Sequence, residues 1–184
     1  MKIYNTTGYS IIVVHALVSG FIAPEEWGFV RGMIVGLGYL LFIWFFGGIY
    51  LSDVMHMGIA HRTLDYKGWF IKFIVVFYNT AGIYINPVSW VNRHRHHHAF
   101  SDHDGDPNKL EEDGFRKTMY LCIFPYKCRK DLARDEVLQS YPFRLVSNRY
   151  FAVLSQVSSY GLLWLAVRDW KYAAVLWLNV RIFA

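Results

Sequence analysis

The residues best suited to chemistry in this sequence are its histidines. Eight are present, and six of them fall in two short stretches, His-Met-Gly-Ile-Ala-His over 56–61 and His-Arg-His-His-His over 94–98. Imidazole is the commonest nitrogen ligand in proteins and suits iron, zinc and copper. The two stretches therefore predict a metal site.

Helical phase decides which histidines of the second stretch can cooperate. If residues 90–99 are helical, each step turns the chain by about 100°, so His94, His97 and His98 share one face. His96 falls on the opposite side, where we expect it to face solvent or to lie behind the ligands. The spacing thus nominates three ligands from this stretch.

The first stretch is harder to interpret. On a regular helix His56 and His61 differ by about 140° and cannot both point the same way. They would then flank a pair of metal ions, or bracket a helix end loosened by Gly58. Five imidazoles exceed what one tetrahedral zinc takes, so a two-metal site is the economical interpretation. The two isolated histidines, His15 and His103, are interpreted as a packing residue and a solvent-facing or supporting residue.

The elements that must position these histidines are membrane helices. The chain has 184 residues, 54% of them hydrophobic and only 18% charged, whereas about a quarter of a soluble domain is charged. The sequence predicts one partial, all-α integral-membrane domain over 1–184 with about four transmembrane helices, the fourth incomplete. The predicted spans are about 9–23, 32–52, 150–167 and 170–184.

A polar stretch, 53–149, separates the second and third spans and holds 14 of the 19 Lys and Arg residues. The positive-inside rule places this histidine-rich, helical region and the N-terminus on the cytoplasmic side of the bilayer. Within it Trp69–Trp90 is apolar but interrupted by polar residues, which favours an interfacial or re-entrant helix. Basic and acidic residues are interleaved, so nucleic-acid binding is not expected.

These motifs resemble the first two histidine boxes of the integral-membrane fatty-acid desaturases. His56 and His61 match the His-x-x-x-x-His box, and His94, His97 and His98 match the His-x-x-His-His box. The flanks are similar to the acyl-CoA Δ9 branch, in which a Trp precedes the second box and Ser-Asp and Asp-Pro follow it, as do Trp90, Ser101-Asp102 and Asp106-Pro107 here.

The resemblance implies a function as well as a fold. The five box histidines would hold two non-haem iron ions, which with O2 and two electrons introduce a cis double bond into a long-chain acyl substrate. No catalytic residue beyond the ligands is implied. The substrate would be an acyl-CoA or another acyl thioester or lipid, and the electron donor a ferredoxin or a b-type cytochrome. Asp102 and Asp106 would accept hydrogen bonds from ligand imidazoles, with a solvated turn as the alternative.

Two departures from the family pattern stand out. The family's third histidine box and a further Asn/His ligand pair would lie beyond Ala184, so we expect a fragment truncated before that box. Animal acyl-CoA enzymes read Trp-x-Arg-Asp-His before the second box, whereas this chain has Trp90-Val91-Asn92-Arg93-His94. Trp90, Asn92 and Arg93 are the candidate contacts to the acyl carrier. Because Asn92-Arg93 stands where the animal enzymes have Arg-Asp, the sequence does not decide which acyl carrier is used.

Three alternatives share parts of this pattern. A membrane diiron hydroxylase or ketolase would carry the same boxes. A zinc transporter would place its ligands within the spans instead of at their cytoplasmic boundary. A non-catalytic membrane metal-binding fragment would bind the ion without turnover.

Overall fold

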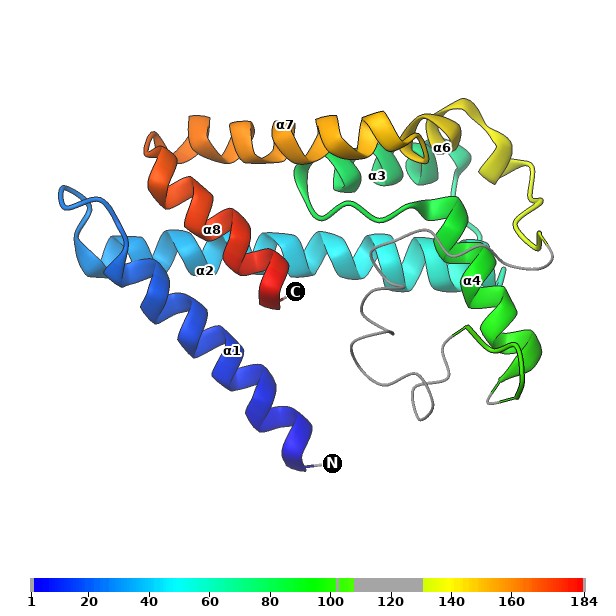
Figure 1. Ribbon diagram of the computed structural model, residues 1–184, viewed down its shortest axis with the longest axis horizontal. Coiled ribbons are helices and arrows are strands. Elements are labelled where there is room, and N and C mark those ends of the chain that lie inside the picture. The colour runs from blue at the N-terminus through cyan, green and yellow to red at the C-terminus, as the bar shows by residue number, and fades with distance from the viewer. Residues whose placement is uncertain (1, 102, 108–130, 184) are drawn as a thin grey trace. The chain divides into compact units, whose positions relative to one another are not determined.

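The computed structural model describes residues 2–101, 103–107 and 131–183, with only the helical course given for 2–9, 182 and 183 (Figure 1). Every regular element in these ranges is a helix, which confirms the predicted all-α class. In chain order the elements are α1 (Lys2–Phe21), α2 (Gly28–Gly47), η1 (Gly48–Ala60), α3 (Gly68–Ala81), α4 (Pro87–Phe100), η2 (Val137–Gln139), α6 (Tyr141–Val146), α7 (Arg149–Val167) and α8 (Trp170–Phe183).

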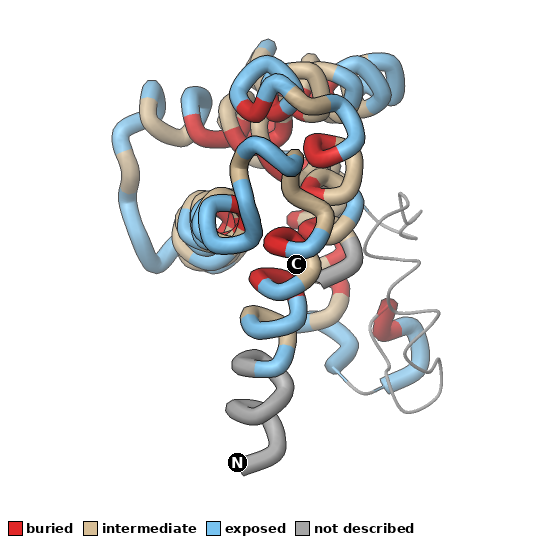
Figure 2. Tube along the Cα trace, turned by 90° about the vertical axis from the view of Figure 1, so that its left-hand side faces the viewer, coloured by how far each residue is buried: buried red, intermediate tan, exposed pale blue. Residues whose placement is uncertain are grey.

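The chain forms two compact units. Unit 1 comprises Met1–Phe46 and Val157–Ala184, and unit 2 comprises Gly47–Gln156. Along the helices of each unit, buried residues alternate with exposed ones (Figure 2). This is the pattern of helices that pack on one side only.

Two helices in the described part of the chain are long and apolar enough to cross a membrane. One is the continuous helix Gly28–Ala60, formed by α2 and η1, and the other is α7. They coincide with the predicted second and third spans. α1 and α8 are helical where the first and fourth spans were predicted, but Ser10–Phe21 is a shorter apolar stretch and α8 has 14 residues. That the four predicted spans cross a bilayer stays a prediction.

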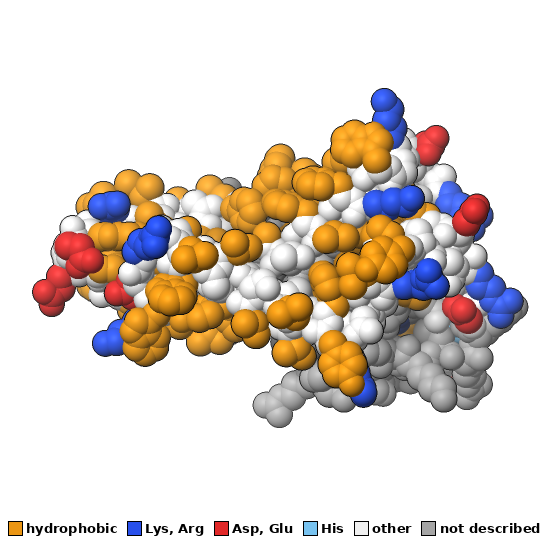
Figure 3. All heavy atoms as spheres, turned by 90° about the horizontal axis from the view of Figure 1, so that it is seen from above, with side chains coloured by type: hydrophobic (Ala, Val, Ile, Leu, Met, Phe, Trp, Pro, Cys, Tyr) orange, Lys and Arg blue, Asp and Glu red, His pale blue; other side chains and the backbone are white. Residues whose placement is uncertain are grey.

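Large hydrophobic side chains are exposed along both long helices. Such side chains also gather on the face shown in Figure 3, and an apolar surface of this kind suits contact with lipid. The exposed residues are Phe29, Val30, Ile34, Leu41 and Phe45 on α2, and Val153, Leu154, Val157, Leu162, Trp164 and Leu165 on α7.

Within unit 1, α1 and α2 approach each other closely at small residues. A Cβ atom added to Gly36 would lie 2.1 Å from Ser19 Oγ, so only a glycine fits there. His15 is fully buried, and its Nε2 lies 2.9 Å from the Gly36 carbonyl oxygen, to which it donates. This agrees with the interpretation of His15 as a packing residue.

Unit 2 is tied together by buried polar groups. Tyr50 of η1 is fully buried and stacks on Tyr78 of α3 at 5.0 Å between ring centroids. Its hydroxyl donates to the Ile85 carbonyl at 3.2 Å, and the Ile85 N–H donates to Asn79 Oδ1 at 2.7 Å. These bonds fix η1, α3 and the segment before α4 as one scaffold.

The start of α4 is set by its own sequence. Asn86 caps the helix, since its Oδ1 accepts the Ser89 N–H at 3.0 Å, and Pro87 occupies the first turn, where its missing N–H costs nothing. Asn86 Nδ2 also donates to the Ser147 carbonyl at 3.2 Å. The second histidine stretch therefore begins from an anchored helix end. The stretch Trp69–Trp90 was expected to form one helix, but it is divided between α3 and the start of α4. Its location at the membrane interface stays a prediction.

Replacing Gly36 by Ala should destabilise the protein, because the new methyl group must displace Ser19, and overpacking costs about 1–3 kcal/mol. Gly38→Ala is the matched control on the same helix, since a Cβ there meets nothing within 4 Å. Thermal unfolding in detergent should show a lower midpoint for Gly36→Ala and an unchanged or raised one for Gly38→Ala. Equal midpoints for the two variants would contradict the close approach of α1 and α2.

Candidate metal centre

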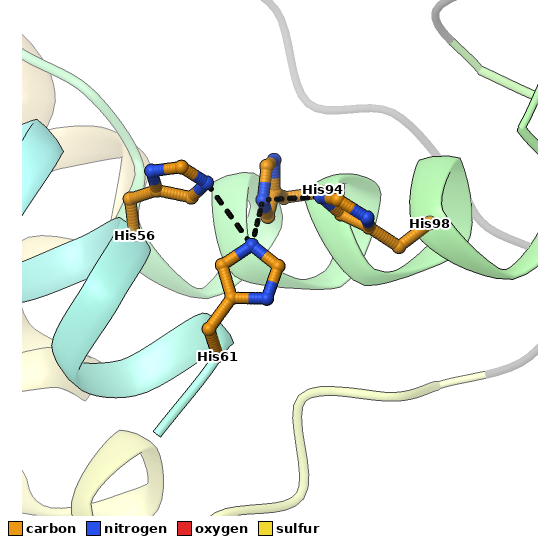
Figure 4. A group of neighbouring side chains, drawn as sticks. All are labelled: His56, His61, His94 and His98. Atoms are coloured by element: carbon orange, nitrogen blue, oxygen red, sulfur yellow. Dashed lines mark hydrogen bonds between the residues drawn. The ribbon is translucent and has the colours of Figure 1, made fainter. Parts of the chain in front are cut away.

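Four of the five predicted ligands converge at one point of unit 2. One ring nitrogen from each of His56, His61, His94 and His98 lies within 4.8 Å of all the others. The Nε2 atoms are 3.0 Å apart for His61 and His56, 3.1 Å for His94 and His61, and 3.1 Å for His98 and His94. Figure 4 shows two rings coming from the end of η1 and two from α4, all pointing toward one another.

The convergence of His56 and His61 corrects the expectation from helical phase. Residues 48–60 form a π-helix, in which hydrogen bonds connect residues five apart instead of four. The His61 N–H donates to the His56 carbonyl at 2.9 Å, which closes such a turn. Residues five apart therefore lie one above the other, and the two rings meet edge to face with centroids 4.6 Å apart.

The prediction for α4 rests on regular helical spacing, and the helix covers the whole stretch. His94 and His98 are four residues apart and meet on one face. Trp90, one turn earlier, stacks flat on His94 with ring centroids 4.9 Å apart and planes only 7° from parallel. The indole thus forms a wall that restricts the orientation of the His94 ring.

His97 has a different environment from the other four. Its Nδ1 lies 2.9 Å from both carboxylate oxygens of Asp106, whose side chain is fully buried. An Nδ1–H that donates to a carboxylate leaves Nε2 as the acceptor, which is the tautomer that binds a metal. Asp106 thus makes the predicted type of contact, through His97, and the ligand role of His97 stays a prediction. Asp102, the other predicted supporting carboxylate, lies outside the described residues.

His96 and His103 are not part of the cluster. Helical phase placed His96 on the opposite side of α4, where we expected it to face solvent or to lie behind the ligands. It is only 5% exposed and stacks on Phe100, which excludes the first of these alternatives. Arg93, three residues before His96 and on the same side of α4, is buried as well, so this side of the helix is packed into the unit. His103 is exposed, as expected.

The cluster favours neutral imidazoles. Burial lowers the pKa of His94 to about 4, and the neighbouring rings, His56 first, add to the effect. The pKa of His61 is also lowered, by desolvation and then by His98 and His56. Deprotonated imidazole is the form that coordinates metals, so these side chains are ready for a cation near neutral pH.

Three of the separations among the four nitrogens match those of donors to a single transition-metal ion. Ligand nitrogens at about 2.0–2.1 Å from a tetrahedral ion are separated by about 3.3 Å, and those at right angles in an octahedral site by about 3 Å. The observed separations of 3.0 and 3.1 Å agree with such a donor set. Within the described ranges this is the one group of histidine, cysteine and acidic residues so arranged.

Of the predicted carrier contacts, Arg93 is buried, and Trp90 and Asn92 are half-buried. Asn92 Oδ1 accepts the Leu132 N–H at 2.7 Å, and Arg93 is only 7% exposed. Trp90 lies against His94, as described above. A role for the three residues in binding a carrier stays a prediction.

Sequence reasoning assigned no role to Asp135, which contacts Arg62 and Arg95, the residues that follow His61 and His94. Burial alone would raise the pKa of Asp135, but the hydrogen bonds and charges of Arg95 and Arg62 outweigh it and hold that pKa below its usual value. Asp135 lies 40 residues beyond Arg95 with no motif around it. The two arginines inside and beside the boxes were the only available signal.

Comparison with known proteins finds relatives that are named as acyl-lipid desaturases. The chain is 28% identical over 150 residues to sn-1 stearoyl-lipid 9-desaturase of Anabaena variabilis, covering 78% of this chain and 51% of the relative. It is 31% identical over 127 residues to sn-2 palmitoyl-lipid 9-desaturase of Nostoc sp. (strain 36), covering 64% and 43%. It is 25% identical over 128 residues to Delta-9 acyl-lipid desaturase 1 of Arabidopsis thaliana, covering 67% and 40%.

The chain thus spans about half or less of the length of these curated relatives. No family model matches the chain, and no solved structure matches it either.

Removing one converging imidazole should abolish tight metal binding, whereas removing a histidine outside the cluster should not. We expect His61→Ala to weaken cobalt(II) binding by more than about tenfold, and the control His103→Ala to bind like the wild type. Titration followed through the visible absorption of cobalt(II) measures both. Equal losses in the two variants would indicate a loose histidine tract instead of a built site.

Proposed function

Because the chain belongs to the fatty-acid desaturase family, we propose that it carries the first part of a metal centre that introduces a cis double bond into a long-chain acyl lipid. The observation that carries this proposal is the convergence of His56, His61, His94 and His98, the residues of two histidine boxes, on one point. Oxidoreductase chemistry follows from the family. The particular activity is our proposal.

Iron bound here would supply the O2 chemistry that removes hydrogen from an unactivated methylene, which no amino-acid side chain can do. The residues of the chain itself would hold the metal and orient its histidine ligands. Four imidazoles bring their nitrogens together, and Trp90 keeps the His94 ring parallel to its own by stacking on it. Asp106 accepts the Nδ1–H of His97, which leaves the lone pair of Nε2 to bind a metal.

We propose that His97 serves the second of the two irons that the family resemblance implies. It is the one predicted ligand held apart from the group of four, and its carboxylate partner fixes the tautomer a metal requires. Two irons need donors in addition to these five histidines.

The acyl carrier proposed here is a membrane lipid in preference to coenzyme A. The relatives are named for acyl-lipid substrates. The positions that hold the coenzyme A head group in the animal pattern are Asn92, bonded to the Leu132 backbone, and Arg93, which is buried. Neither side chain presents a charge to a phosphate-rich head group. The bilayer would deliver the substrate, and a cytoplasmic ferredoxin or b-type cytochrome the electrons.

The test is lipid analysis in a yeast strain that lacks its own Δ9 desaturase. The open reading frame that contains residues 1–184 is expressed there, and the fatty acids of the extracted lipids are identified by mass spectrometry. We expect new cis-monounsaturated acids, their loss in His94→Ala, and their retention in His103→Ala. His103 is the control because it is an exposed histidine outside the cluster.

Other products would identify other functions. Hydroxy or keto acids would show a hydroxylase or ketolase instead. No product, together with zinc as the bound metal under iron-replete growth, would contradict the proposal and support a metal-binding protein. Assays of the purified protein with stearoyl lipid and with stearoyl-CoA separate the two carriers, and turnover of the CoA ester alone would overturn the lipid assignment.

A further inference from the structure

The segment just before η2 lies along one face of α4 and is held there through the backbone of a single residue. The Leu132 N–H donates to Asn92 Oδ1 at 2.7 Å, and the Leu132 carbonyl accepts from Arg95 Nη1 at 2.7 Å. Asn92 and Arg95 are three residues apart, so both lie on the same face of the helix. Both backbone polar groups of Leu132 thus attach the segment to the helix that carries His94 and His98.

The same guanidinium also holds the end of η1. Arg95 Nη2 donates to the Ile59 carbonyl at 2.7 Å and Arg95 Nε to the Ala60 carbonyl at 3.3 Å. Carbonyls in the last turn of a helix have no donor within that helix, so they require one from elsewhere. Arg95 provides it from the position directly after His94, and the carbonyls directly precede His61.

Asp135 joins this junction from the other side. One carboxylate oxygen accepts from Arg62, whose Nε lies 3.1 Å away, and the other oxygen pairs with Arg95. The Asp135 side chain is 11% exposed and that of Arg95 16%, so this pair is largely shielded from water, whereas the Arg62 side chain is 72% exposed.

The backbone conformation of Arg62 also indicates a role for Asp135. Its φ is 57°, in the left-handed region that a residue with a Cβ rarely adopts. This conformation turns the chain immediately after His61, and the contact with Asp135 holds it. Asp135 therefore contacts both the residue that follows His61 and the residue that follows His94.

We propose that Asp135 is a positioning residue of the metal centre. By holding Arg62 and Arg95 together, it fixes the separation between the histidine pair of η1 and the pair of α4. This inference rests on the proposed function only in that the cluster binds a transition metal. Asp135 itself contacts none of the four rings in the interactions described above.

The test compares metal binding in folded protein, because an ion pair of purely structural importance would change stability and leave the site intact. Asp135→Asn keeps the shape and removes the charge, and Asp135→Glu restores the charge. Glu136→Gln is the matched control, since it removes an exposed neighbouring acid. Each variant is titrated with cobalt(II), its visible absorption band is recorded, and its unfolding is measured without metal.

We expect Asp135→Asn to bind cobalt(II) about 10- to 100-fold more weakly, the range typical of residues that orient ligands, with a changed absorption band. Asp135→Glu should recover part of the cobalt(II) affinity and part of the wild-type absorption band. Glu136→Gln should match the wild type in both. Lowered thermal stability with unchanged affinity and band in Asp135→Asn would overturn the inference. Failure of the wild type to bind cobalt(II) tightly would overturn the proposed function, and this inference with it.

A second pair of variants keeps the test decisive if Asp135→Asn does not fold. Arg62 is largely exposed, so Arg62→Gln should fold and still weaken binding, by less than Asp135→Asn because Arg95 retains its partner. Arg134→Gln removes another exposed arginine nearby and should leave the affinity unchanged. Equal affinities for these two variants would contradict the role assigned to the Asp135 junction.

Discussion

The backbone hydrogen bond from the His61 N–H to the His56 carbonyl spans five residues, and the arrangement of the metal centre depends on it. In an α-helix the same residues would point about 140° apart. The wider turn places them one above the other at the end of a long apolar helix. π-helical geometry is rare and often marks functional sites, because it re-aims side chains that a regular helix would disperse.

The two imidazoles at that helix end need further ligands from a second element held at a fixed distance. α4 supplies two imidazoles one turn apart, and its capped start is fixed to α3 and to the segment after α6. Arg93 and His96, on the opposite side of α4, are buried, so rotation of the helix would expose them to water. Packing on one side thus sets the direction in which His94 and His98 project, and Arg95 closes the remaining gap to η1.

Much of this could be predicted from residue types and spacing. The apolar runs predicted the helices. The 3.6-residue period rejected His96 and selected His94, His97 and His98, of which His94 and His98 lie in the cluster. The same period failed for His56 and His61, because no pattern in the sequence reports a π-helix. The buried state of His96 and the role of Asp135 depend on contacts between residues distant in the chain, which spacing alone does not contain.

X-ray absorption at the iron edge would examine the converging histidines directly. The chain of residues 1–184 is loaded with one equivalent of iron(II), and the first-shell donors are counted together with the outer-shell scattering that imidazole rings produce. Convergence of the four rings predicts about four imidazole nitrogens on one ion. A shell dominated by oxygen, with two imidazoles or fewer, would show that η1 and α4 do not share a metal.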